Sequence, residues 1–257
     1  MIHRAVPVCH LLPVALSRTF TSPYNKWYAS ERSILFNTRP ILSETTVEDR
    51  TRFFKSSLPK VGTNIEMDIL RKLSNCSSSI GESTDKHGKE LLYYTRKSSF
   101  FLQFLNFIPE VRGEDGVQRD PSELKALKFE HLDTRNLSLA ILSSSLFFWY
   151  NTVNSDCRNL NKREVVSFPI PDHVPGSVYP VVDGLIDQLM ADYRANSELR
   201  TVRYQGKGAI TVQYFNFRPS KPILDDIDRL LGPIYGLTAA ETDFIVNYEI
   251  KYRLGSE

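Results

Sequence analysis

The densest group of basic and amide side chains lies in residues 155–171, the run SDCRNLNKREVVSFPIP. Three bases and two amides stand close together there: Arg158, Lys162, Arg163, Asn159 and Asn161. Guanidinium and ammonium groups bind phosphate oxygens, and arginine and asparagine also form paired hydrogen bonds to guanine and adenine edges. The run therefore predicts a nucleic-acid contact. The alternative is a helix C-terminus that cations and amide caps stabilise.

A second basic segment covers residues 193–221, where six bases occur with one acid, Glu198. Five aromatic residues are interleaved with the bases, which offers stacking surfaces beside phosphate-binding charges. The candidate DNA contacts in this segment are Arg203, Tyr204 and Lys207. The alternative is a solvated face whose aromatic rings belong to the core. Residues 222–257 reverse the sign, with seven acids and three bases.

No sequence motif marks a catalytic or metal-binding centre. GxGxxG, GxxxxGKS/T, HExxH and GxSxG are all absent, the five histidines are scattered singly, and the cysteines share no CxxC spacing. We therefore assign no catalytic and no metal-binding residue. A nuclease would need carboxylates and a lysine, for which Asp172, Glu249 and Lys251 are the candidates. Asp172 and Glu249 are 77 residues apart, so this alternative is weak.

Composition bounds the class of protein. Of 257 residues, 41% are hydrophobic and 24% charged, which excludes disordered and collagen-like chains. The chain has 32 Lys and Arg residues and 30 Asp and Glu residues, and its net charge of +2 is too small to indicate a class of binding partner. Three cysteines are too few and too scattered for a disulfide framework or a structural zinc site, and they favour a reducing cytoplasm.

Two segments resemble membrane or targeting signals. Residues 136–155 carry no charge over a length that spans a bilayer, but three central serines and polar ends favour a buried helix, so we expect no membrane partner. The first 30 residues are basic and without acids, as in a transit peptide. Their short apolar stretch equally suits the remnant of a larger domain.

Several helices are expected from capping and periodicity. Thr63 and Glu66 have capping-box spacing, residues 136–153 read as one helix that is apolar nearly all round, and residues 177–193 as an amphipathic helix. A C-terminal pair follows. Pro222 opens the first helix of the pair, with Gly232-Pro233 to stop it, and a Thr238/Glu241 capping box opens the second. The second is expected to bury Phe244, Ile245, Tyr248 and Tyr252.

Strands are expected at residues 90–95 and 100–108, separated by the turn RKSS, and at 209–215. Alternation in the last strand predicts one buried face, formed by Ile210, Val212 and Tyr214. The fold class is therefore mixed α/β, of the α+β kind, with a buried central helix, short strands and a C-terminal helix pair. The stretch FPIPDHVPG at 168–176 is the expected boundary between a body (61–171) and a C-terminal extension (172–257), after an N-terminal part (1–60).

Three segments together resemble the C-terminal, TaqI-like target-recognition region of adenine-specific DNA methyltransferases of restriction-modification systems (type II/IIG class). They are AILSSSLFFWYNTVNSDCRNLNKREVVSFPIP, SKPILDDIDRLLGPIYGL and ETDFIVNYEIKYRLG. NKWYASERSILF and YYTRKSSFFLQFLNFIPEV are similar to parts of the same region, so the resemblance extends from Tyr24 to Gly255. It implies a domain that recognises and holds double-stranded DNA beside a Rossmann-like domain that binds S-adenosylmethionine.

The chain departs from this family where the chemistry would occur. The catalytic motif Asn/Asp-Pro-Pro-Tyr/Phe has only Ser22-Pro23-Tyr24 as its nearest string, and the glycine-rich cofactor loop is absent. The resemblance thus implies the DNA-binding recognition part, with no cofactor of its own, working with a methyltransferase catalytic domain or subunit carried elsewhere. Residues 1–60 would be the edge of that domain. The alternative is a protein-interaction subunit, or a remnant without DNA binding, that docks through the acidic C-terminal helices.

Overall fold

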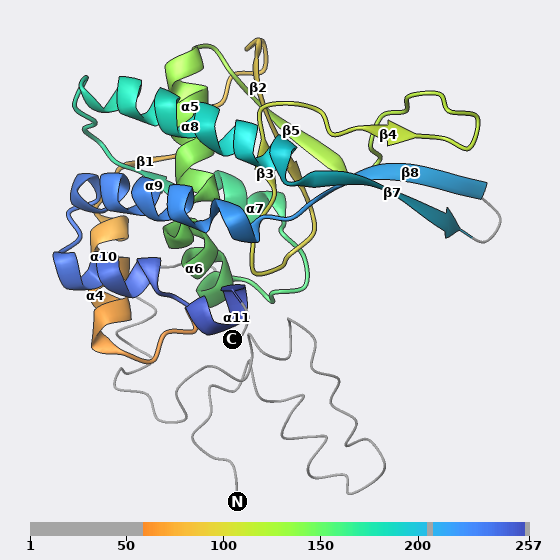
Figure 1. The fold of residues 1–257 in the computed structure, drawn as a ribbon. Coiled ribbons are helices and arrows are strands. Elements are labelled where there is room, and N and C mark those ends of the chain that lie inside the picture. Colours follow the sequence, from red (N-terminus) through yellow and green to blue (C-terminus); the bar gives the residue numbers. More distant parts are fainter. Residues whose placement is uncertain (1–58, 205–207, 255–257) are drawn as a thin grey trace, which may run out of the picture.

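The computed structural model describes residues 59–204 and 208–254 (Figure 1). The N-terminal part that was expected to be the edge of a catalytic domain, residues 1–60 with Ser22-Pro23-Tyr24, lies almost entirely outside the described residues. The helices are α4 (Asn64–Ser74), α5 (Leu132–Ser143), α6 (Ser145–Asn154), α7 (Lys162–Val166), α8 (Val178–Ala195), α9 (Lys221–Ile234), α10 (Ala239–Val246) and α11 (Ile250–Leu254). The strands are β1 (Ser78–Ser79), β2 (Glu90–Thr95), β3 (Phe104–Leu105), β4 (Val111–Arg112), β5 (Leu124–Phe129), β6 (Pro169–Ile170), β7 (Ser197–Tyr204) and β8 (Gly208–Phe215).

The strands form three small sheets, in the orders β3-β2-β5, β4-β8-β7 and β1-β6, and every pairing is antiparallel. The combination of several helices with small antiparallel sheets confirms the α+β class. In Figure 1 the helices gather on one side, while β7 and β8 extend away from them as a two-stranded ribbon, with β4 beside it. We call β7 and β8 together the ribbon.

The central apolar segment is buried as expected, but it is not one helix. It breaks at Ser144, whose ψ of 157° is extended and whose Oγ accepts from the Phe147 N–H at 3.1 Å. Asp228 Oδ1 accepts from the next two backbone N–H groups, at 2.9 and 3.3 Å. Serine competes with the helical backbone and favours a cap position, so the serine run starts a second helix. Among the described residues, no helix is long and apolar enough to cross a membrane.

Aromatic residues fill the core around α6. The Phe147 ring lies 5.2 Å from Phe168 and 5.6 Å from Phe104, centroid to centroid. Trp149, fully buried, donates from Nε1 to Glu66 Oε1 at 3.2 Å, and the same carboxylate completes the capping box that was predicted with Thr63. The buried cluster includes residues on both sides of the 168–176 stretch, and the division into two units there stays a prediction.

The C-terminal helices differ from expectation in two details. The Thr238/Glu241 capping box is confirmed, but Gly232-Pro233 does not stop α9, which continues to Ile234. The second expected helix is interrupted after α10, where Glu249 has a φ of 56° and α11 begins. Of the face expected to be buried, Ile245 and Tyr248 are buried, whereas Phe244 on α10 and Tyr252 after the turn are only half-buried.

A buried polar cluster joins these helices to the break between α5 and α6. Arg253 Nη1 donates to Ser145 Oγ at 2.6 Å, and its guanidinium lies between the rings of Phe101 and Phe148, at 4.8 and 4.9 Å. Burial raises the pKa of Asp228 to about 6, although the Ser145 hydrogen bond and the nearby Arg253 favour its charged form. Burial likewise lowers the pKa of Arg253. Residues 222–254 therefore brace the body of the protein.

Two strand expectations need correction. Of residues 100–108 only β3 pairs with β2, because the chain from Arg96 to Gln103 turns toward another segment: the Leu160 N–H donates to the Arg96 carbonyl at 2.8 Å. The strand at 209–215 is confirmed as β8, but its faces are not divided as predicted. Tyr214 is 41% exposed and Phe215 is buried, because the ribbon leaves the body and only its base packs, through Phe215.

Candidate nucleic-acid interface

The basic and amide side chains of the run at 155–171 come from the loop between α6 and α7 and from the start of α7. Arg158, Asn159, Lys162 and Arg163 are exposed and Asn161 is half-buried. The end of α6 is stabilised by other groups: the Ser155 N–H donates to the Asn151 carbonyl at 2.9 Å, and the buried Lys60 ammonium donates to the Ser155 carbonyl. The helix-end alternative thus describes Lys60, which sequence analysis did not select, and not Lys162 or Arg163.

The charges of the run are unequally compensated. Arg163 donates to Glu164 Oε1 from Nε at 3.1 Å and from Nη2 at 2.7 Å, so an adjacent, buried carboxylate holds it. The Asp156 carboxylate accepts from the Arg158 N–H at 2.9 Å. Lys162 has no ion pair within residues 59–204 and 208–254. Lys162 is therefore a cation of the run that is available to take a phosphate.

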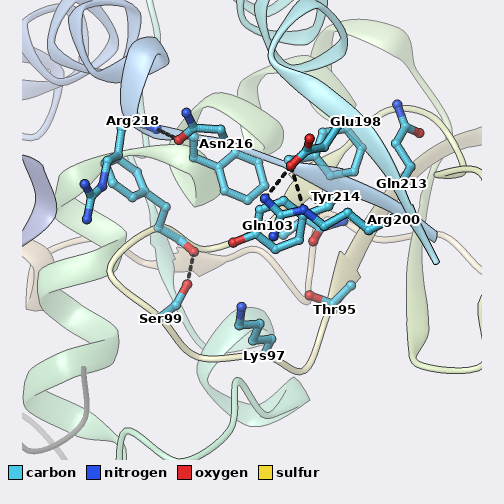
Figure 2. Close-up of a pocket in the computed structure, with 13 residues that line it drawn as sticks. Thr95, Lys97, Ser99, Gln103, Glu198, Arg200, Gln213, Tyr214, Asn216 and Arg218 are labelled. Atoms are coloured by element: carbon cyan, nitrogen blue, oxygen red, sulfur yellow. Dashed lines mark hydrogen bonds and ion pairs between the residues drawn. The ribbon is translucent and has the colours of Figure 1, made fainter. Parts of the chain in front are cut away.

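A backbone bridge connects the run to a second surface. Lys97 and Asn159 pair as an isolated antiparallel bridge, so the loop after β2 lies directly against the run. The same loop forms one wall of a cleft of about 510 Å³. The ribbon and the segment after it form the other wall. Figure 2 shows Lys97 and Ser99 on the loop facing Arg200 and Tyr214 on the ribbon, with Arg218 at one end.

The ribbon carries the second set of predicted contacts. β7 pairs with β8 from Ser197↔Phe215 to Tyr204↔Gly208, and Arg203 is exposed, opposite Ala209. Leu199 and Val202, which alternation places on opposite faces, are 50% and 40% exposed, so both faces of the ribbon are open to solvent. The side chain of Tyr204 and the whole of Lys207 lie outside the described structure.

Arg200 is a residue of this surface that sequence analysis did not select. Its guanidinium carbon lies 3.7 Å from the centroid of the Tyr214 ring, and its Nε donates to Glu198 Oε1 at 2.6 Å. The alternation along β7 puts Glu198 and Arg200 on one face, which was readable from the sequence. The register that brings Tyr214 opposite Glu198 was not, because the length of the turn is not evident from the residues alone.

The nuclease candidates are not assembled. Asp172 accepts from the Ser77 N–H and hydroxyl, both at 2.7 Å, and these hydrogen bonds lower its pKa. Glu249 lies instead at the turn between α10 and α11. Over the described ranges no three His, Cys, Asp or Glu side chains are grouped as metal ligands.

Two of the four aromatic residues of the acidic C-terminal helices, Tyr235 and Tyr248, belong to the core, whereas Phe244 and Tyr252 are half-buried and docking through them stays an untested alternative. Tyr235 is buried and donates from its hydroxyl to the Pro169 carbonyl at 2.8 Å, and the buried Tyr248 packs on Phe148. Their rings contribute to the core instead of a partner-binding face.

No protein-family model matches the chain, and neither a curated protein nor a solved structure matches it. The chemistry must therefore be judged from the residues themselves. S-adenosylmethionine in a Rossmann-like domain needs parallel strands joined by helices, with a glycine-rich loop at a helix N-terminus. The described strands pair only in antiparallel fashion, so the described residues do not fit such a cofactor site.

Proposed function

We propose that this chain is the DNA-binding target-recognition part of an adenine-specific DNA methyltransferase. The observation that carries the proposal is the Lys97–Asn159 bridge, which joins the basic run to the cleft beneath the ribbon. Cations far apart in the sequence thereby border one surface: Lys97 and Lys162 on one side, Arg200 and Arg218 on the other. Cations distributed in this way suit the phosphates of a duplex.

The ribbon suits the role of reading element. A two-stranded β-ribbon fits the major groove of B-DNA, where each base pair presents a distinct pattern of donors and acceptors. With both faces exposed, the ribbon can enter a groove while Lys97 and Lys162 contact phosphates beside it. Phosphate contacts fix the position of the protein, and contacts to base edges supply sequence preference.

Methyl transfer belongs, in this proposal, to a separate catalytic domain or subunit that binds S-adenosylmethionine. That partner flips the target adenine out of the helix and methylates its exocyclic amine. The chain described above clamps the duplex and selects the sequence.

Lys162→Ala tests the proposal directly. Because binding releases condensed counterions, the association constant falls with salt to a power of about −0.9 per phosphate contact, so loss of one contact should make the slope of log affinity against log salt shallower by about 0.9. At 0.1 M salt the same loss should weaken duplex binding roughly eightfold. The measurement is fluorescence anisotropy with a labelled duplex over a salt series. Lys86→Ala is the matched control, since Lys86 is exposed and precedes β2, whereas the cleft lies beyond the other end of that strand. Equal slopes for the two variants would contradict the assignment.

The proposal also predicts that the purified chain transfers no methyl group to DNA and acquires this activity only with its catalytic partner. The reason is the lack of a fitting cofactor site among the described residues and of the Asn-Pro-Pro-Tyr motif in the sequence. Incorporation of labelled methyl groups from S-adenosylmethionine by the chain alone would refute the division of labour.

A further inference from the structure

The guanidinium of Arg200 is held in one orientation before any ligand binds. It stacks on Tyr214 at 3.7 Å, and Glu198 Oε1 accepts from its Nε at 2.6 Å and also pairs with its Nη2 (Figure 2). A planar guanidinium fixed by a ring and a carboxylate loses little freedom on binding. Such an arrangement favours a geometrically demanding contact over a diffuse attraction to phosphate.

The donors that stay available define what Arg200 can recognise. Glu198 takes the Nε side, and Nη1 has no partner among the described residues. The outer edge of the guanidinium, formed by Nη1 and Nη2, therefore keeps a pair of parallel N–H donors. Guanine presents two acceptors, N7 and O6, at the matching spacing in the major groove.

We propose that Arg200 is the specificity-determining residue of the ribbon and that it reads a guanine in the target site. This inference rests on the proposed function. Arg203 supplies the contrast on the same strand. It lies three residues on, hence on the opposite face, and the described residues offer it neither an ion pair nor a stacking ring. Arg203 is thus a phosphate contact, and Arg200 a base contact.

The experiment selects bound duplexes from a randomised pool with the wild-type chain, with Arg200→Lys and with Arg203→Lys. The wild type should prefer guanine at one position by roughly 5- to 150-fold. Arg200→Lys keeps the positive charge and removes the pair of parallel N–H donors. It should therefore abolish the preference for guanine and leave the salt dependence of the affinity unchanged. Arg203→Lys should keep the preference. Replacing the preferred guanine with 7-deazaguanine, which lacks the N7 acceptor, should weaken the wild type and not Arg200→Lys.

Glu198→Gln separates positioning from charge. Removing a carboxylate near DNA should tighten binding to all sequences, yet the loosened guanidinium should discriminate less well. Melting curves for each variant show that the fold is intact.

The outcomes distinguish this inference from the function on which it rests. If the wild type binds no duplex, both fail. If it binds without a guanine preference, or if Arg200→Lys keeps the preference, the role of Arg200 is overturned and the proposed function stands. Equal weakening of all sequences by Arg200→Lys would make Arg200 a phosphate contact, which also overturns the inference.

Discussion

Reversing three charges at once, Lys97→Glu, Lys162→Glu and Arg203→Glu, should nearly abolish duplex binding. The three side chains are exposed and come from the loop, the basic run and the ribbon, and no ion pair holds them within the described structure. Each lost phosphate contact costs roughly eightfold in affinity at 0.1 M salt, so three together cost on the order of 500-fold, before repulsion is added. The slope of log affinity against log salt should fall by about 2.7.

The control is a triple variant with the same change in net charge at remote positions: Arg71→Glu, Lys86→Glu and Lys128→Glu. All three residues are exposed, on α4, before β2 and on β5. We expect at most a modest loss, because exposed charges more than about 10 Å from the duplex are screened at 0.1 M salt. If both triple variants weaken binding equally, the attraction comes from net charge, and the cleft and ribbon are not a binding site.

Local signals in the sequence were sufficient for much of the fold. Both capping boxes, at Thr63 and at Thr238, were readable because a cap requires particular side chains at a fixed spacing. The break at Ser144 was not readable. A serine run inside an apolar segment is compatible with one helix or two, and Asp228, 84 residues away, supplies the hydrogen bonds that stabilise the second helix start.

The candidate site depended even more on long-range pairing. Lys162 and Arg203 were identifiable as basic residues, but the sequence does not reveal that Lys97 pairs with Asn159 or that Lys60 occupies the end of α6. The faces of β8 were mispredicted for a related reason. Alternation indicates a buried face only where a core covers the strand, and the ribbon extends beyond its core.

Arg253→Ala should destabilise the protein strongly and leave the DNA-binding surface intact. Arg253 is 2% exposed and donates a hydrogen bond to Ser145. Its positive charge also interacts with the buried carboxylate of Asp228. Removing one of two interacting buried charges typically costs about 3–5 kcal/mol, and because Lys221 still lies near Asp228 we expect a cost toward the lower end of that range. Arg229→Ala is the control: that arginine is exposed, its partner Asp226 is too, and such pairs contribute about 0–1 kcal/mol. Urea titration of both variants measures the difference.

The pH dependence of this loss identifies its cause. The folded-state pKa of Asp228, about 6, lies above the ordinary value of 3.8, so the folded protein binds the proton more tightly than the unfolded chain. The stability contributed by this group is therefore present below pH 4 and lost as the pH rises toward 6. Without Arg253 the charged form of the Asp228 carboxylate becomes still less favourable in the folded protein, whereas its protonated form is little affected. The loss of stability caused by Arg253→Ala should therefore be smaller at pH 4 than at pH 8.

Arg253→Met, which keeps most of the volume and removes the charge, should show the same trend with less loss of packing. Constant cost across this range would assign the effect to packing alone. Because the Arg253 side chain is buried, a folded Arg253→Met variant should keep its affinity for the duplex.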